Sequence, residues 1–419
     1  MASAIGWALV DRGPGPGSTS DFIGPRWKDE SADHFTFAAS ADFGGRGNVD
    51  SIALAARARA SGASFLVALG DLGYSGEGGS CRDVGRYIPE LVIVAGDLEV
   101  GQYQRGNRSG LAQACPYSLS SPYVAGNGTP GYGFEYYFDY PRASPLARFI
   151  MISAGLAEGF GYNYSKHSPR VEWIEDAVDD ARDHGLPWVI VGVHHQCLTV
   201  AARLNCSMGQ AVFDELVESK VDLILAGQDT AYERTKQLDQ SDECPSINAT
   251  NPYDASCITP QSSPDRYEKG EGTVVVVQGV GGRPLENVTI DGTNPEIGYF
   301  TEVMGQNANT EGRLPGFGSV FYNVTAHSIT AETDFCPPGS VAGGWHCLAG
   351  RDTVFTDRFA ISDAPLPPVL SLLAAPPPDG SFPDTSRSAI AIDVPRADAV
   401  NAVLRGVYLR TRWAHWGFG

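Results

Sequence analysis

The stretch Val221-Asp-Leu-Ile-Leu-Ala-Gly-Gln-Asp-Thr-Ala-Tyr-Glu-Arg-Thr235 decides the fold, because a short apolar run leads directly into polar residues. Residues 221–226 have the length and apolar content of a buried strand. The glycine that follows, with Gln228, Asp229 and Thr230, is typical of a loop at the carboxyl end of that strand. Ligand-binding loops gather at such ends in α/β sheets, so the stretch predicts a strand that delivers polar side chains to a site.

The same pattern of an apolar run followed by a polar loop recurs along the chain. Further candidate strands are residues 35–40, 65–69, 91–95, 148–153, 188–193 and 273–278, and candidate helices are 49–60, 171–183 and 210–220. Short apolar runs that alternate with helical stretches predict an α/β domain. From residue 318 to 363 the pattern becomes β-rich, with candidate strands at 320–324 and 354–361, so the domain closes with an α+β character.

We expect four parts along the 419 residues: an N-terminal extension, 1–34; the α/β domain, 35–363; a linker, 364–384; and a C-terminal tail, 385–419. Seven prolines between 364 and 384 predict a stiff, extended linker. The tail contains a candidate strand, 389–394, and a candidate helix, 397–409. It either docks onto a partner, which includes self-association in a surface assembly, or packs on its own domain.

Charge and hydropathy exclude some classes of partner. The formal net charge is −19, which disfavours nucleic acid and anionic membranes. No apolar run approaches the roughly 18 residues of a membrane span. The first 20 residues lack the basic and apolar regions of a signal peptide, so no signal peptide is evident in this sequence.

Sequons and cysteines nonetheless predict an extracellular or cell-surface protein. Seven of the 13 asparagines lie in N-glycosylation sequons: Asn107, Asn127, Asn163, Asn205, Asn248, Asn287 and Asn323. The eight cysteines fall into pairs that are close in sequence, which favours the disulfides Cys81–Cys115, Cys197–Cys206, Cys244–Cys257 and Cys336–Cys347. A zinc site is the weaker alternative, because no Cys-x-x-Cys occurs. Disulfides and N-glycans together indicate an oxidising compartment.

Carboxylates and an imidazole follow several candidate strands, which is what a pair of bridged metal ions requires. Asp42 follows the first strand, Asp71 and Tyr74 the second, Asp97 the third, and His194 the strand 188–193. Other interpretations of these residues remain open. Asp42 and Asp71 could cap the helices that follow them, His194 and His195 could form a buried hydrogen-bonded pair, and Tyr74 could be a packed aromatic residue.

The order and spacing of these motifs resemble the calcineurin-like metallophosphoesterases, and among them the purple acid phosphatases, over residues 35–361. Their motifs run DxG, GDxxY, GNH(D/E), VxxH and GHxH, and 221–235 is similar to the family segment VDLVLSGHDHxYERT. The resemblance implies a β-sandwich with flanking helices. It also implies one metal held by Asp42, Asp71 and Tyr74, with a tyrosinate indicating ferric iron, and a second held by Asp71, Asp97 and His194. The metals would activate a water that attacks the phosphate ester.

The sequence departs from the family pattern at three positions that carry chemistry. Leu98 occupies the place of a histidine that steadies the phosphate or protonates the leaving group. Gln228 and Thr230 occupy the places of two metal-binding histidines, so Gln228 is at best a weak ligand. We therefore expect no metal or a single weakly held one; an active form would need a di-metal centre of iron with zinc, manganese or a second iron.

Three functions remain as hypotheses. The first is a pseudoenzyme, a secreted glycoprotein on a phosphatase scaffold that is used for binding or assembly. The second is a residual metal-dependent phosphomonoesterase. The third is a subunit of a surface layer or filament that adds its tail strand to a neighbour's sheet.

Overall fold

The structure is a computed structural model that describes residues 33–44, 47–72, 81–88, 90–99, 135–156, 163–249, 251–260, 264–342, 346–347 and 353–363. The chain divides into two compact units, 1–366 and 367–419, and all described residues belong to the first. The predicted linker, C-terminal tail and nearly all of the N-terminal extension lie outside the described residues. So do Tyr74, Cys115, Asn107 and Asn127.

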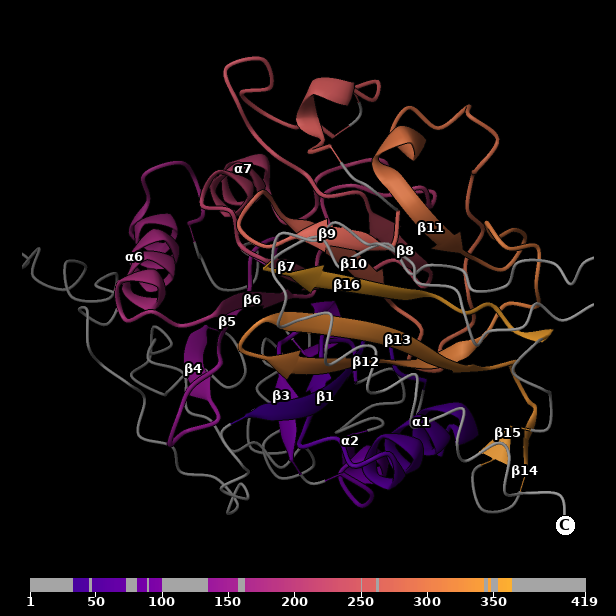
Figure 1. Ribbon diagram of the computed structural model, residues 1–419. Coiled ribbons are helices and arrows are strands. Elements are labelled where there is room, and N and C mark those ends of the chain that lie inside the picture. The colour runs from indigo at the N-terminus through magenta and orange to yellow at the C-terminus, as the bar shows by residue number, and fades with distance from the viewer. Residues whose placement is uncertain are drawn as a thin grey trace, which may run out of the picture. The chain divides into compact units, whose positions relative to one another are not determined.

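The first of two large sheets contains seven strands and mixes parallel and antiparallel pairs (Figure 1). Its order is β3 (Leu91–Ile93), β2 (Leu66–Ala68), β1 (His34–Ser40), β12 (Phe317–Thr325), β13 (Ser328–Cys336), β16 (Arg358–Ser362) and β9 (Arg266–Glu268). The strands β1, β2 and β3 run parallel, so their carboxyl ends meet at one edge. Strand β12 joins this parallel block to the antiparallel strands that follow.

The second sheet also has seven strands and contributes a second parallel block. Its order is β11 (Phe300–Met304), β8 (Tyr232–Thr235), β10 (Val274–Gln278), β7 (Leu223–Ala226), β6 (Trp188–Val193), β5 (Ala147–Ile152) and β4 (Tyr136–Tyr140). Strands β5, β6, β7 and β10 are parallel. A small third sheet pairs β14 (Val341–Ala342) with β15 (His346–Cys347).

Aromatic side chains join the two large sheets. Phe35 and Phe37 of β1 are fully buried and alternate with residues on the opposite face, as a two-residue repeat requires. The ring centroid of Phe37 lies 5.1 Å from that of Phe149 in the second sheet and 4.8 Å from that of Tyr322 in the first. These residues belong to one buried cluster that draws on both sheets, so the core of the sandwich lies between them.

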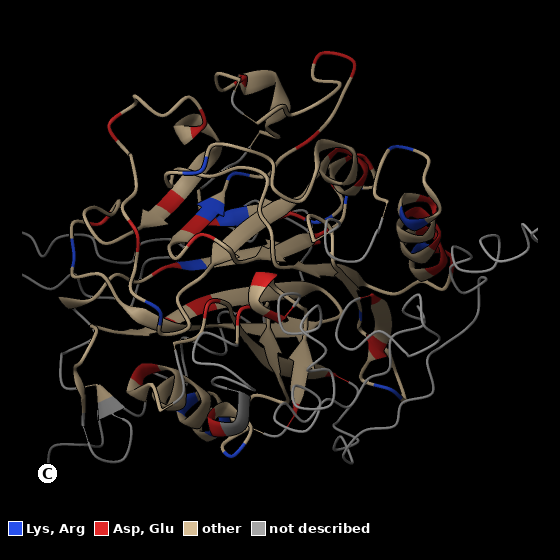
Figure 2. Cartoon of the chain, turned by 180° about the vertical axis from the view of Figure 1, so that it is seen from behind, with Lys and Arg blue, Asp and Glu red and all other residues tan. Residues whose placement is uncertain are grey.

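Helices flank the sandwich, with α6 and α7 beside the second sheet and α1 and α2 beside the first (Figure 1). The helices are α1 (Val49–Ala60), α2 (Cys81–Val84), α6 (Pro169–Asp183) and α7 (Gln210–Glu218), with two short 3₁₀ turns, η1 (Ala255–Cys257) and η2 (Ile297–Tyr299). Helix α6 begins at a proline after the N-cap Ser168, which suits the first turn of a helix. The ribbons of α6 and α7 contain many acidic residues, and α6 also contains basic ones (Figure 2).

The structure confirms the predicted fold class, a mixed α/β sandwich with flanking helices and β-rich closing strands. The expected strand 354–361 is wrong at its start, because β16 begins at Arg358 and Val354 forms only an isolated bridge with Leu314. Strand β8 was not predicted, because its Glu233 and Arg234 are buried charged residues rather than part of an apolar run.

Three of the predicted disulfides are present, Cys197–Cys206, Cys244–Cys257 and Cys336–Cys347. The fourth pairing involves Cys115, outside the described residues. Within the described part of the chain, no helix has the length and apolar character needed to cross a membrane.

Candidate metal site

The loops after β1 and β2 hold two aspartates in an unusual backbone conformation. Asp42 has a φ of 56° and Asp71 a φ of 55°, and Gln228, after β7, has a φ of 72°. Left-handed backbone costs an ordinary residue roughly 1–2 kcal/mol, and such residues cluster at functional sites. Five non-glycine residues of the described chain have a positive φ, and these are three of them. Three of these five left-handed positions therefore lie at the predicted site.

The inner cluster, as we call Asp42, Asp71 and His194, brings three buried ligand groups together. One ligand atom from each lies within 4.8 Å of the others. The Nδ1 atom of His194 lies 2.7 Å from the Leu69 carbonyl oxygen, and its Nε2 atom lies 3.5 Å from Asp71 Oδ1. A bond from Nδ1 to a carbonyl fixes the ring so that Nε2 faces the carboxylates, as in many histidines that bind metals.

The charge of the inner cluster favours a cation. Burial alone would lower the pKa of His194, but the carboxylates of Asp71 and Asp42 raise it to about 9. The pocket therefore attracts a proton to an imidazole that is fully buried. A metal ion would compete with that proton for the same ring nitrogen, since ligand histidines bind in the neutral form.

The outer cluster, Asp97, His194 and His195, overlaps the inner one through His194. His195 Nε2 lies 3.2 Å from Asp97 Oδ1. The hydrogen bond from His195 lowers the pKa of Asp97 to about 2, against the opposing effect of burial. His195 was not among the predicted ligands, although its place beside His194 at the end of β6 was a signal in the sequence.

Glu99, in the third motif, holds the backbone of the site. Its carboxylate accepts hydrogen bonds from the N–H groups of Asp71, Leu72 and Gly96, each 2.8 Å long. Burial, together with the nearby charge of Asp71, raises the pKa of Glu99 to about 7. This side chain ties the loops after β2 and β3 together.

Leu98 contributes its backbone rather than its side chain to the site. Its N–H donates to Asp71 Oδ1 at 3.0 Å. The leucine side chain has no polar atom, so it can neither transfer a proton nor bind an oxyanion. The backbone of this motif thus lies beside Asp71, but the side chain at position 98 has no imidazole to donate a proton or a hydrogen bond.

The loop after β7 approaches the site through its backbone. The Gln228 N–H donates to Asp42 Oδ2 at 2.9 Å. When the Gln228 amide is oriented to satisfy its neighbours, Nε2 donates to Asp97 Oδ2 at 3.2 Å and lies 2.8 Å from His195 Nε2, which accepts from it in the tautomer that carries its proton on Nδ1. The amide oxygen accepts from Arg203. Thr230 donates from its N–H to Glu286 Oε1 at 2.6 Å. Gln228 therefore adjoins the outer cluster.

The structure answers two of the alternative interpretations. Helix α1 is capped by Asn48, whose side chain accepts from the Ser51 N–H at 2.9 Å, so the N-cap of α1 is not Asp42. His194 and His195 are both buried, but their ring centroids lie 5.3 Å apart and each ring faces a different carboxylate. Both imidazoles are thus buried and hydrogen-bonded, but the partners of their Nδ1 atoms are other residues, the Leu69 carbonyl for His194 and the Ser207 carbonyl for His195.

The described residues fit one cation well and fit the complete family pattern poorly. The inner cluster supplies two carboxylates and one imidazole, a donor set suited to zinc, manganese or iron. A bound ion of this kind supplies Lewis acidity and lowers the pKa of a coordinated water. The family pattern requires two further imidazoles, and Gln228 and Thr230 stand at those positions.

No family model matches the sequence. Among solved structures, the fold resembles purple acid phosphatase PPD1 from yellow lupin (Lupinus luteus) seeds, at 15% identity and a TM-score of 0.51. The match covers 80% of this chain and 54% of the lupin chain, so the chain spans about half of that enzyme's length. With the two mixed sheets and their flanking helices, this likeness shows that the chain has a metallophosphoesterase-like fold.

Two further solved structures resemble the chain at lower scores. PhoD matches at 12% identity and a TM-score of 0.48, over 74% of this chain and 67% of that one. GAP50, described as the anchor in the inner membrane complex of Plasmodium, matches at 12% identity and a TM-score of 0.44, over 79% of this chain and 92% of that one. All these identities are too low to indicate more than the fold.

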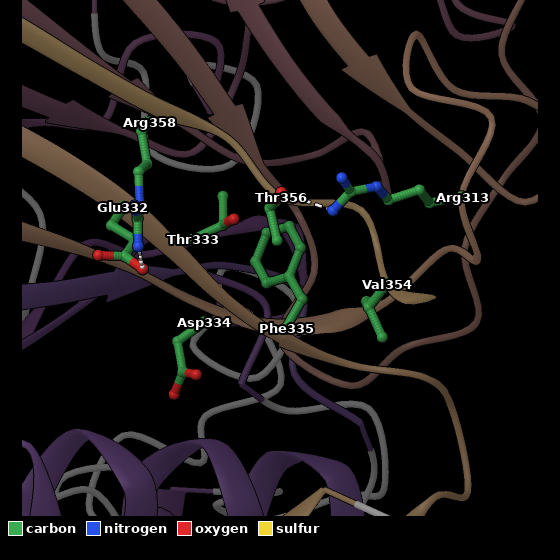
Figure 3. Close-up of a pocket in the computed structure, with 8 residues that line it drawn as sticks. All are labelled: Arg313, Glu332, Thr333, Asp334, Phe335, Val354, Thr356 and Arg358. Atoms are coloured by element: carbon green, nitrogen blue, oxygen red, sulfur yellow. Dashed lines mark hydrogen bonds and ion pairs between the residues drawn. The ribbon is translucent and has the colours of Figure 1, made fainter. Parts of the chain in front are cut away.

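A separate pocket of about 280 Å³ lies against β13 and the residues before and within β16 (Figure 3). It contains none of the residues of the two clusters. Its charged side chains already have partners: Arg358 pairs with Glu332 at 2.5 Å, and Arg57 donates from Nε to Asp334 Oδ2 at 2.9 Å. Arg313 donates to Thr356 Oγ1 at 3.2 Å. We therefore place the candidate function at the strand ends.

Proposed function

We propose that this protein is a secreted glycoprotein on a purple-acid-phosphatase-like scaffold, which retains one cation at the inner cluster and has lost most or all phosphoesterase activity. The observation that carries this proposal is the contrast within one site. Asp42, Asp71 and His194 converge in a buried cluster, whereas Leu98, Gln228 and Thr230 offer no imidazole. The protein then acts by binding or by surface assembly.

The expected losses of catalytic rate and of metal affinity are large enough to support impaired catalysis rather than a small change in activity. A general acid contributes about 10²–10⁴-fold to a rate, and Leu98 cannot act as one. Loss of a group that supports a metal site typically costs about 10–100-fold in affinity or activity. Two ligand positions are changed in addition to the acid, so the combined loss exceeds that of any one of them.

The surface chemistry supports a secreted location. The three disulfides suit an oxidising compartment. The sequon asparagines of the described chain are all exposed: Asn163, Asn205, Asn248, Asn287 and Asn323. Exposed acceptors are a requirement for N-glycans. We further propose that residues 364–384 act as a linker and 385–419 as a tail that promotes self-association.

The second candidate function is a residual phosphomonoesterase, and the outer cluster favours it. His195 lies 3.2 Å from Asp97 and supplies an imidazole on the side of the site where the family pattern is incomplete. A hydrolase with this arrangement would work slowly, because Leu98 still leaves it without the expected acid.

Elemental analysis of the natively purified protein tests the proposal. We expect one tightly held ion per chain and hydrolysis of p-nitrophenyl phosphate close to background. Asp42→Asn should remove that ion, and Asn tolerates the positive φ of this position. The matched control is Asp183→Asn, at the exposed end of α6. Two tightly held ions with rapid turnover, or an ion that survives Asp42→Asn, would contradict the proposal.

A further inference from the structure

We propose that His195 replaces a missing imidazole and forms, with Asp97 and the side-chain oxygen of Gln228, a second and weaker site for a divalent cation. This inference rests on the proposed scaffold and adds to it a ligand set that departs from the family pattern. In that pattern the metal-binding histidine at the end of β6 is His194, and position 228 is itself a histidine. Here His195, the residue that follows His194 after β6, would take that role.

The orientation of the His195 ring supports a ligand role. Its Nδ1 atom lies 3.3 Å from the Ser207 carbonyl oxygen. When Nδ1 donates its proton to that carbonyl, Nε2 is left with a lone pair that faces Asp97 Oδ1 at 3.2 Å. A lone pair and a carboxylate oxygen repel each other unless a proton or a cation lies between them. Ligand atoms of a tetrahedral zinc ion stand about 3.3 Å apart, given metal–ligand bonds of about 2.0 Å.

Gln228 supplies a third atom at the same point. The side-chain amide atom on this side lies 2.8 Å from His195 Nε2 and 3.2 Å from Asp97 Oδ2. With nitrogen in that place the amide donates to both neighbours. With the amide oxygen in that place, three atoms with lone pairs face one another: the Gln228 oxygen, His195 Nε2 and an Asp97 carboxylate oxygen. A cation between them can bind all three. A half-turn of one side-chain torsion therefore exchanges a hydrogen-bonded arrangement, in which the amide oxygen accepts from Arg203, for a ligand set in which a bound cation compensates for the loss of that bond.

The surroundings of His195 fix the ring in place. Gly155 has a φ of 89°, and a Cβ there would lie 2.0 Å from His195 Nδ1 and 2.4 Å from the Ser207 oxygen. The Ser207 N–H donates to the Gln196 carbonyl at 2.9 Å, where the Cys197–Cys206 disulfide closes the loop. The disulfide, the Ser207 carbonyl and the absence of a side chain at Gly155 together position one imidazole.

The exposure and charge of the two clusters predict different affinities. The Asp97 side chain is 52% exposed, whereas the inner cluster is buried, so the outer site is accessible to ions from solvent. One carboxylate, one imidazole and one amide carry less charge than the two carboxylates of the inner cluster. Mixed nitrogen and oxygen ligands suit zinc and cobalt better than magnesium or calcium.

Titration of the metal-stripped full chain with Co²⁺ tests this inference, with binding followed by calorimetry and by the visible absorption of the bound ion. We expect two classes of site in the wild type. His195→Ala should weaken the weaker class at least about tenfold and leave the tighter class unchanged. His327→Ala, an exposed histidine on the β12–β13 turn, is the matched control. Circular dichroism verifies that each variant is folded.

A second pair of variants tests the same site without removing a ligand. Gly155→Ala should displace His195 and weaken the same class of site. Gly62→Ala should not, because Gly62 has a similar φ of 81° but a Cβ there would meet nothing within 4 Å. Equal Co²⁺ binding by the wild type, His195→Ala and Gly155→Ala would overturn the inference. A single site lost in Asp42→Asn but kept in His195→Ala would overturn it while leaving the proposed function intact, and no binding at all would overturn both.

Discussion

The two sheets deliver different chemistry to the same site. The parallel strands of the first sheet end in carboxylates, Asp42, Asp71 and Asp97, and none of these is replaced by an apolar residue. The second sheet delivers His194, but its β7 loop carries Gln228 and Thr230 where imidazoles are expected. The backbone of that loop nevertheless stays in place, since the Gln228 N–H still donates to Asp42. The scaffold therefore does not depend on the ligand chemistry it carries.

The loops of the two sheets are also held in different ways. Glu99 ties the first-sheet loops together by accepting three backbone hydrogen bonds. The contacts of the second-sheet loops are spread over several elements. They include a disulfide, a contact from the Ser207 carbonyl to His195, and hydrogen bonds from Gln228 to Asp42 and from Thr230 to Glu286. We therefore expect changes at Glu99 to affect stability, and changes in the second-sheet loops to affect metal binding.

The largest expected effect comes from restoring the imidazoles of the second sheet and the missing acid. The variant Asp97→Asn, Leu98→His, Gln228→His and Thr230→His rebuilds the family pattern on a backbone that already approaches the site. We expect p-nitrophenyl phosphate hydrolysis to rise at least about 100-fold, since an acid and two ligands are regained together. Steady-state rates and metal content per chain measure the gain.

A folded quadruple variant that binds no additional metal would contradict this prediction, because the second-sheet loops would then lie in the wrong place. A wild type that is already as active as the variant would also contradict it. Leu98→His alone is the matched control. It restores the acid without the ligands and should gain much less.

The sequence predicted the strands that position the site, because each is a short apolar run buried on both faces. Strand 188–193 and helix 49–60 were predicted with the bounds observed for β6 and α1. Strand β8 was missed because its charged side chains find their hydrogen-bond partners only in the folded state. Arg234 donates to Asp357, 123 residues away, and Glu233 accepts from the Thr199 hydroxyl at 3.2 Å. A local pattern carries no information about partners so distant.

The candidate site was predictable where one residue follows one strand and unpredictable where it depends on tertiary contacts. Asp42, Asp71, Asp97 and His194 were found from their positions after strands, and the structure brings them together. The place of His195 depends on Gly155 and Ser207, which belong to other loops. Nothing in the order of the sequence indicates that these three residues meet.

The next largest effect should come from the residue that ties the first-sheet loops. Glu99→Ala leaves three buried N–H groups without their acceptor, which we expect to lower the free energy of unfolding by about 3 kcal/mol. Glu90→Ala is the control, because Glu90 pairs with the exposed Arg59 at 3.4 Å and its loss should cost below about 1 kcal/mol. Urea denaturation measures both. Equal losses would mean that Glu99 does not hold these loops.

A smaller effect should separate two disulfides. Cys197→Ser with Cys206→Ser, and Cys244→Ser with Cys257→Ser, each remove a disulfide between cysteines 9 and 13 residues apart, at a cost of about 2 kcal/mol each. Only the first pair frees the loop that holds the Ser207 carbonyl against His195. We therefore expect similar losses of stability but a weaker second Co²⁺ site in the first variant alone. A change of Co²⁺ binding in both variants would indicate a general loosening of the fold.

The smallest effect concerns the outer face of the first sheet. Asn323 is an exposed sequon asparagine between the buried Tyr322 and Val324 of β12, and it pairs with Thr36 of β1 and Thr330 of β13. The other described sequons lie outside strands, so this is the one that would place a glycan over a sheet. Asn323→Gln exchanges one exposed polar side chain for another, and we expect the free energy of unfolding to change by less than about 0.5 kcal/mol.

Mass spectrometry of protein from a secreting host should show the loss of one N-glycan in Asn323→Gln. Asn294→Gln is the control: Asn294 is buried, lies outside any sequon and donates to the Thr199 carbonyl at 3.3 Å, so it should cost stability and leave the glycans unchanged. An unmodified Asn323 in the secreted protein would contradict the prediction. A glycan at Asn323 would cover the outer surface of β1, β12 and β13 around it. Any assembly contact must then use another surface. The two sheets would then differ in their outer faces as well as in the ligands of their site loops.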